Sequence, residues 1–159
     1  MTYHNHPPRQ TSAPHRPTLG LPLLAVISLA LLATPRVVLH DLELIQEGTL
    51  VNALFVFVPP IIWIAVVLWK RVPNPFITLL VVGLFYGVFL ALGHQLLWNV
   101  SFGDNPPALG GNLTDLDPAA QSVILRTFAG ISSVFTGVIV GAITGLIAWG
   151  LSKVIGPKR

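Results

Sequence analysis

The chain has no cysteine among its 159 residues. A disulfide scaffold, a zinc–thiolate site and an iron–sulfur cluster are therefore excluded. Charge is scarce as well, since charged residues make up 9% of the sequence against roughly 25% in an ordinary soluble domain. Too few charges remain to cover a small soluble globule, and a disordered chain would be polar and charged rather than apolar.

Long apolar runs are what the sequence has instead, with 53% of its residues apolar. A helix that crosses the hydrocarbon core, which is about 30 Å thick, needs about 20 mainly apolar residues. Four segments reach or approach that length, namely residues 19–34, 50–69, 76–98 and 128–151. The sequence therefore predicts an all-α integral membrane protein, a four-helix transmembrane bundle whose membrane domain covers residues 19–155.

The first of these segments is the weakest, because it is short and carries Pro22 near its start. It can be extended through residues 37–39, with Arg36 then reaching out to the lipid headgroups. A cleaved signal peptide is an alternative, since Ser28-Leu29-Ala30 is a passable cleavage site. We expect the segment to be retained, because the stretch that precedes it is long for the basic region of a signal peptide.

The distribution of charge predicts how the chain is threaded. One side of the four spans holds Arg9, Arg16, Lys70, Arg71, Lys153, Lys158 and Arg159. The other side holds two cations, Arg36 and Arg126, and all the acids. By the positive-inside rule the cationic side stays in the cytoplasm. We expect a multi-pass protein of the plasma membrane, as in the bacterial inner membrane, with both termini cytoplasmic.

Three segments are expected outside the hydrocarbon core. Residues 1–18 are polar and predict a disordered cytoplasmic tail, whose His4, His6 and His15 we interpret as part of a polar tail rather than as a metal-binding tract. Residues 35–49 place apolar side chains at helical spacing and predict a short amphipathic helix on the outer surface. Residues 99–121 form the longest outer loop.

Small residues recur every four positions in the last two spans. The two rows are Gly83, Gly87 and Ala91 in one helix, and Ser133, Gly137, Gly141 and Gly145 in the other. Small side chains let helix backbones approach closely, and van der Waals packing associates helices in lipid. The rows predict close packing between these two helices, or a face that seals an oligomer.

Pro59-Pro60 interrupts the second span near its middle. Each proline lacks an N–H group and clashes with the carbonyl group four residues earlier, here those of Phe55 and Val56. Such a break must be shielded from lipid by protein or by a water-filled cavity. It can serve as a hinge or as a fixed bend that shapes the bundle.

Ionisable and polar residues near the outer ends of the spans predict a candidate pocket. Its members are His94, Gln95, Arg126, His40 and Glu47. Polar groups at such depth favour a functional role, and this set suits a small anion or a proton relay. The alternative is that Arg126 extends to lipid phosphate and that His94 lies at the wet interface.

No catalytic, metal or cofactor motif is evident. Gly130-Ile131-Ser132-Ser133 resembles half of a nucleophile motif, but residue 134 is valine, and no orienting partner is identifiable. Phosphate loops, dinucleotide fingerprints and paired-histidine metal motifs are missing from the sequence. We therefore expect no enzyme activity, no cofactor, no metal site and no nucleic-acid binding.

Two functions remain from different classes. The first is a non-catalytic accessory or assembly subunit, whose partners are the lipid bilayer and either another membrane protein or further copies of itself. The alternative is a small transporter or channel with an outward-facing polar pocket and a proline-kinked helix. The first rests on small size and the glycine rows, and the second rests on Pro59-Pro60 and the candidate pocket.

Overall fold

The computed structural model describes residues 19–103 and 105–155. The expected tail over residues 1–18, with its three histidines, lies outside the described residues. The helices in chain order are α1 (Leu23–Leu32), α2 (Pro35–Asp41), α3 (Leu50–Trp69), α4 (Pro75–Phe102), the short 3-10 helix η1 (Gly111–Leu113) and α5 (Pro118–Ile155). Four helical stretches are long and apolar enough to cross a membrane, if α1 and α2 count as one span. The predicted all-helical chain with four spans is confirmed at this level.

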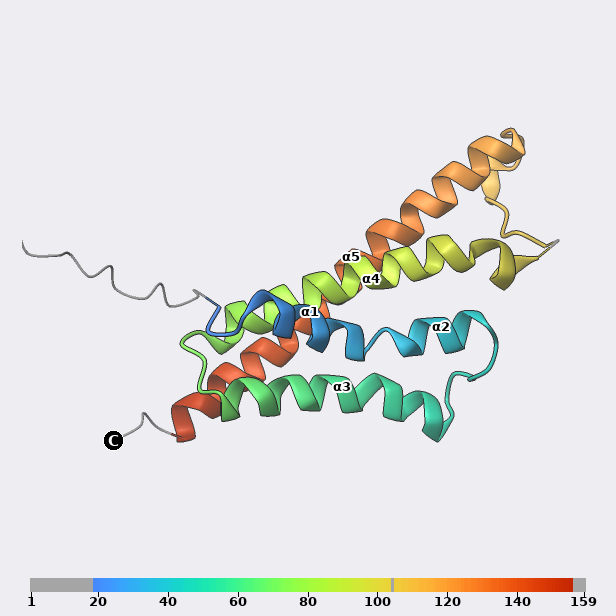
Figure 1. Cartoon of the computed structure of the whole chain (residues 1–159). Coiled ribbons are helices and arrows are strands. Elements are labelled where there is room, and N and C mark those ends of the chain that lie inside the picture. Colours follow the sequence, from blue (N-terminus) through green and yellow to red (C-terminus); the bar gives the residue numbers. More distant parts are fainter. Residues whose placement is uncertain (1–18, 104, 156–159) are drawn as a thin grey trace, which may run out of the picture.

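The two ends of the bundle, which can be followed in Figure 1, differ in the charged residues that the sequence places there. The start of α1, the link between α3 and α4 and the end of α5 lie together, and we call this the basic end because Lys70, Arg71 and Lys153 lie there. The turn after α2 and the segment over residues 103–117 lie at the opposite end, which we call the acidic end. It contains Glu43 and Glu47.

The first span is a broken helix rather than a span followed by a surface helix. Pro35 has no N–H group to donate to Leu31, and the N–H of Thr34 donates to the Leu31 carbonyl instead, at 3.1 Å. The chain then restarts as α2, which continues along the bundle and buries Val37 and Asp41. The predicted surface helix over residues 35–49 is therefore wrong, because burial against α4 holds α2 in the bundle and residues 42–49 form turns.

The closest helix contact in the bundle is the crossing of α4 with α5 (Figure 1). Gly83 and Gly87 of α4 face Gly137 and Gly141 of α5. A Cβ atom added to Gly141 would lie 2.7 Å from the Leu79 carbonyl oxygen and 2.9 Å from the Gly83 Cα atom. Only glycine permits this approach, so the small-residue rows are used for packing inside a single chain.

Both α4 and α5 are longer than the spans read from hydropathy. Their 28 and 38 residues correspond to about 42 Å and 57 Å at 1.5 Å per residue. Helix α5 begins at Pro118, because the Asp117 carboxylate accepts the N–H of Ala119 at 2.9 Å and proline suits the first helical position. The segment between the helices is therefore residues 103–117 rather than 99–121.

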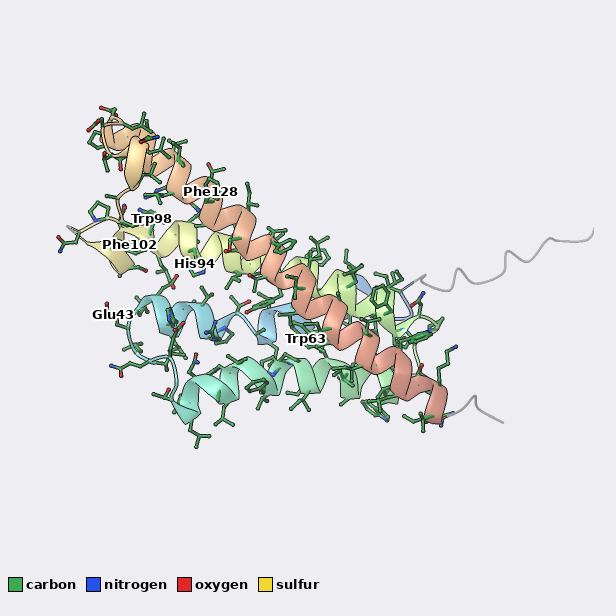
Figure 2. The ribbon with its side chains drawn as sticks, turned by 180° about the vertical axis from the view of Figure 1, so that it is seen from behind. Glu43, Trp63, His94, Trp98, Phe102 and Phe128 are labelled. Atoms are coloured by element: carbon green, nitrogen blue, oxygen red, sulfur yellow. The ribbon has the colours of Figure 1, made fainter. Side chains whose placement is uncertain are left out.

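The apolar core lies between α1, α3 and α4 in the half nearest the basic end. Its fully buried side chains include Val26, Trp63, Val67, Leu79 and Val82. The indole Nε1 of Trp63 donates to the Leu29 carbonyl oxygen at 2.7 Å, which ties α3 to α1. Figure 2 shows Trp63 inside the bundle, whereas Phe128 lies on the exposed side of α5. Towards the acidic end, α5 leans away from α3 (Figure 1).

Candidate functional site

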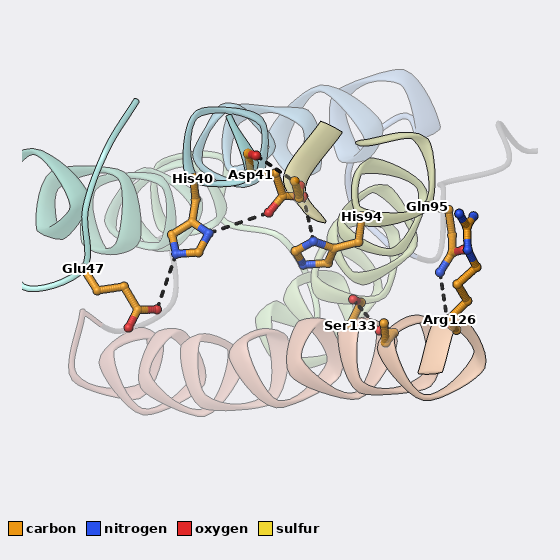
Figure 3. A network of polar contacts seen from close by, with 9 residues as sticks. His40, Asp41, Glu47, His94, Gln95, Arg126 and Ser133 are labelled. Carbon is orange, nitrogen blue, oxygen red and sulfur yellow. Dashed lines mark hydrogen bonds and ion pairs between the residues drawn. The ribbon is translucent and has the colours of Figure 1, made fainter. Parts of the chain in front are cut away.

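Asp41, at the end of α2, is the centre of a polar cluster (Figure 3). Its side chain is 7% exposed, and its Oδ2 atom lies 2.8 Å from Nδ1 of His94 on α4. Its Oδ1 atom lies 3.6 Å from Nδ1 of His40, and Nε2 of His40 lies 3.6 Å from Oε1 of Glu47. Four ionisable groups therefore lead in sequence from the exposed Glu47 to His94. The contact between His94 and Asp41 is within hydrogen-bond distance, whereas the two contacts of His40 are longer.

The local structure explains why Asp41 faces α4. Val37 and Asp41 are one helical turn apart, so both lie on the face of α2 that is buried. The Ser101 hydroxyl of α4 donates to the Asp41 carbonyl oxygen at 3.0 Å and satisfies one carbonyl at the end of the short helix. Backbone and side chain of Asp41 are thus both joined to α4.

The five residues predicted to form one pocket fall into two groups. His40, Glu47 and His94 gather around Asp41. Gln95 and Arg126 form a separate contact, in which the Gln95 amide donates to the Arg126 carbonyl oxygen at 2.9 Å (Figure 3). His94 and Gln95 are adjacent in the sequence, but neighbouring residues on a helix point about 100° apart. His94 therefore contacts α2, whereas Gln95 contacts α5.

Arg126 is occupied by protein groups near the acidic end. Its guanidinium donates to the Asn99 side-chain oxygen at 3.1 Å and lies 5.0 Å from the centre of the Trp98 ring. It lines a cavity of about 390 Å³ together with Gln121 and Pro106. Gln121 also donates to the Thr114 and Leu116 carbonyl oxygens, which holds the preceding segment against α5.

Arg36 lines two of the cavities of the bundle and was not among the residues predicted to form the pocket. It was expected to reach the headgroups, but its Nε atom donates to the side-chain oxygen of Asn52 on α3, at 3.0 Å. Asn52 is buried. Two features of the sequence hint at this contact. Arg36 lies inside an apolar stretch, and Asn52 is the one strongly polar side chain of residues 50–69. Nothing in the sequence stated that the two residues meet.

Three cavities with shared lining residues run along this side of the bundle. The end cavity, of about 560 Å³, is lined by His40, Asp41, Gln46, Glu47 and Ser101, among others. The middle cavity, of about 210 Å³, is lined by residues that include Arg36, His40, Asp41, His94, Ser133 and Thr136. The inner cavity, of about 190 Å³, is lined by residues that include Arg36, Pro60, Trp63, Tyr86 and Thr136. Consecutive cavities share two residues, first His40 and Asp41, then Arg36 and Thr136.

The inner cavity lies beside the break between α1 and α2 and beside the proline pair of α3, which continues as one helix through both prolines. Ala33 and Arg36 come from either side of the break between α1 and α2, and Pro60 comes from the proline pair of α3. Because the prolines have no N–H group, the carbonyl groups of Phe55 and Val56 have no helical donor, and both of these residues line the inner cavity. Pro59 itself is buried. The proline break therefore faces protein and a cavity, as a mid-span break requires.

Comparisons with protein families, with curated proteins and with solved structures found no match for the chain. Within the described ranges, no group of three or more histidine or acidic side chains is arranged to hold a metal ion. The site is thus a row of polar cavities with a cation at its inner end and a histidine–aspartate cluster nearer the acidic end. Such an arrangement can hold water or a small polar solute, and its histidines can exchange protons.

Proposed function

We propose that the chain is a small membrane transporter that admits a small polar solute from its acidic end to the inner cavity. The observation that carries this proposal is the sharing of lining residues from the turn after α2 down to Pro60. Binding sites at mid-membrane, flanked by interrupted helices, are a recurring design of secondary transporters. Here α1 and α2 are separated by such a break, and α3 is a continuous helix that carries a proline pair in its middle.

The proposed orientation places the basic end in the cytoplasm and the acidic end outside the plasma membrane, as in a bacterial inner membrane. Lys70, Arg71 and Lys153 support it through the positive-inside rule. Aromatic residues are enriched at both membrane interfaces, so the contacts of Lys70 with the Trp69 ring at 4.6 Å and of Lys153 with the Trp149 ring at 5.6 Å support an interface at the basic end without deciding its side. Both termini are then cytoplasmic.

In this proposal the structure corresponds to a state open to the outside and closed to the cytoplasm. Between the inner cavity and the basic end lies the apolar core, where Trp63 and Val67 have no exposed surface. Release of solute to the cytoplasm requires this part of the apolar core to move. The break between α1 and α2 and the proline pair of α3 lie beside it and can act as hinges, because helices bend where backbone hydrogen bonds are missing.

Accessibility of single cysteines tests the aqueous route, since the chain has no cysteine of its own. Thr136→Cys places a thiol in the middle and inner cavities, and Ile139→Cys places one on the same helix outside the lining. A membrane-impermeant sulfonate thiol reagent, added from outside, should label Thr136→Cys several times faster than Ile139→Cys. Equal, slow labelling of both positions would contradict a water-filled route.

Flux into liposomes tests transport itself. Stopped-flow light scattering of proteoliposomes should show faster entry of at least one small polar solute than in protein-free liposomes. Pro60→Ala restores the N–H donor to the Val56 carbonyl, straightens α3 beside the inner cavity and should slow that entry. Absence of any protein-dependent flux across a panel of small neutral solutes, cations and anions would overturn the proposal.

An accessory or assembly subunit is the second proposal, and either role is non-catalytic. Its support is the low burial of the first two spans, Leu23–Asp41 and Leu50–Trp69. In the most apolar window of each span, 22% of the residues are buried inside the protein. The surface left over is available to lipid, to another membrane protein or to further copies. Because the glycine rows are used between α4 and α5, a partner would contact another face. A fixed partner or oligomer in mild detergent, together with no flux, would favour this role.

A further inference from the structure

Arg36 carries a positive charge into the interior of the bundle without an acidic partner. The ion pairs among the described residues join His40 and His94 to Asp41 and Glu47, and none involves Arg36. Its hydrogen-bond partner, Asn52, supplies a neutral amide oxygen. A cation at membrane depth is costly unless an opposite charge or water accompanies it. The charge of Arg36 therefore calls for an anion or for solvent.

Several hydrogen-bond donors around the two deeper cavities have no protein partner. Arginine has several N–H donors, of which Arg36 uses its Nε–H on Asn52. Among the described residues, no hydrogen bond engages the hydroxyl groups of Tyr86 and Thr136, which line the inner cavity with Arg36. No buried polar side-chain atom of the described chain is left without a partner, so the hydroxyl group of the buried Tyr86 retains some accessible surface, and Thr136 is an exposed residue. Donors that converge on one space suit an acceptor ligand.

Depth separates a soluble anion from a lipid phosphate. Pro60 lies near the middle of α3, a helix of 20 residues, so the deepest lining of the inner cavity is about 15 Å from either end of that helix. The Arg36 side chain enters this cavity from nearer the acidic end, because its partner Asn52 is the third residue of α3. Lipid phosphates lie at the ends of a span rather than at its middle. The inner and middle cavities measure about 190 and 210 Å³, against about 30 Å³ for one water molecule in the liquid. A small anion with part of its hydration shell therefore fits.

Asp41 is the opposing charge in the middle cavity. It faces the two histidines, with His94 at 2.8 Å and His40 at 3.6 Å. Arg36 lines both the middle and the inner cavity, whereas Asp41 lines the middle and end cavities but not the inner one. The lining of the inner cavity therefore combines the cation with Tyr86 and Thr136 and includes no acidic side chain, so an anion would be held there.

We propose that the inner cavity binds a small monovalent anion, such as chloride, bromide or nitrate, on the Arg36 guanidinium, with Tyr86 and Thr136 as further donors. This inference rests on the proposed transport function only for the route by which the anion enters. Binding at equilibrium does not depend on that route. The site would make anions the solute class of the transporter.

Bromide quenching of Trp63 tests the site, because Trp63 lines the same cavity as Arg36. The probe is the full chain with Trp69, Trp98 and Trp149 replaced by phenylalanine, in an uncharged maltoside detergent that contains no phosphate. Bromide should quench the remaining tryptophan in a saturable manner, and nitrate should compete. Quenching that rises linearly with bromide, without saturation, would overturn the proposal.

Charge substitutions identify the residue responsible. Arg36→Gln keeps a donor for Asn52 but removes the charge, and it should weaken bromide binding at least tenfold. Arg126→Gln, the same change at a cation outside these cavities, should leave binding unchanged. If Arg36→Gln fails to fold, Arg36→Lys should retain saturable quenching and Tyr86→Phe should weaken it several-fold. Unchanged binding in Arg36→Gln or in Tyr86→Phe would overturn the assignment.

Competition with a lipid and a flux measurement distinguish a soluble-anion site from a lipid site, and anion binding from transport. Displacement of bromide by phosphatidylglycerol but not by nitrate would assign the site to a lipid headgroup and overturn the soluble-anion proposal. Saturable bromide binding without flux would support the anion site and contradict transport. Flux that is equal for anions and cations, and unaltered in Arg36→Gln, would support transport and contradict the anion site.

Discussion

The Nδ1 atom of His94 lies 2.8 Å from Oδ2 of Asp41, and this contact joins the end of α2 to α4. A second bond, from the Ser101 hydroxyl to the Asp41 carbonyl oxygen, joins the same residue to α4 two helical turns further on. Helix α2 has only seven residues, too few to be stable alone. These two contacts therefore help to hold the helix that carries Arg36 and forms one wall of the middle cavity.

The contact between His94 and Asp41 should show measurable energetic coupling. In a double-mutant cycle with His94→Leu and Asp41→Leu, we expect a coupling of about 0.6–1.7 kcal/mol, the range found for polar contacts between membrane helices. The measurement is the free energy of unfolding in detergent. His40→Leu is the matched control, because His40 lies farther from Asp41, at 3.6 Å. Strictly additive effects of the His94 and Asp41 changes would show that the contact contributes nothing.

The glycine crossing of α4 with α5 predicts a large difference between two glycine substitutions on one helix. Gly137→Leu drives a side chain into the backbone of Gly83 and Gly87, whereas Gly130 has nothing within 4 Å of an added Cβ atom. Gly137→Leu should destabilise the protein by at least about 1–3 kcal/mol, the usual cost of overpacking. Thermal unfolding in detergent measures it, and Gly130→Leu should be close to neutral. Similar losses in both variants would contradict the described crossing.

Trp63 should contribute through its indole N–H as well as through its size. Trp63→Phe removes the donor to the Leu29 carbonyl oxygen and should cost about 0.6–2 kcal/mol of stability, as for other polar contacts in membrane helices. Trp69→Phe is the control, because Trp69 is 77% exposed and should lose little. Chemical denaturation followed by circular dichroism compares the two. Equal stability of Trp63→Phe and the parent protein would remove the role assigned to this bond.

The proposed orientation predicts opposite labelling of two single cysteines. Ala108→Cys lies in the exposed segment between α4 and α5, and Pro73→Cys lies in the exposed link between α3 and α4. An impermeant thiol reagent applied to intact cells should label Ala108→Cys, and it should label Pro73→Cys only after lysis. The reverse pattern would invert the topology, and labelling of both positions in intact cells would argue against a membrane crossing by α4, the helix between them.

The number of helices in the described chain that are long and apolar enough to span a membrane followed from the sequence, because transfer of a segment into lipid depends on the sum of its own side chains. The proline pair and the glycine rows were also legible, since missing N–H groups and missing side chains act locally. The sequence thus predicted which surfaces allow close approach, whereas α3 runs unbroken through its proline pair and the break in the described chain lies between α1 and α2.

The tertiary structure alone decided what those features face. The same Arg36 can extend to headgroups or enter the bundle, and the choice depends on Asn52, which lies 16 residues away. The same residues 35–49 can lie on the surface or continue the first span, and burial of Val37 and Asp41 against α4 decides between them. Such choices depend on contacts between distant segments, which hydropathy and periodicity do not contain. For that reason the spans were predictable, and the cavities with their cation were not.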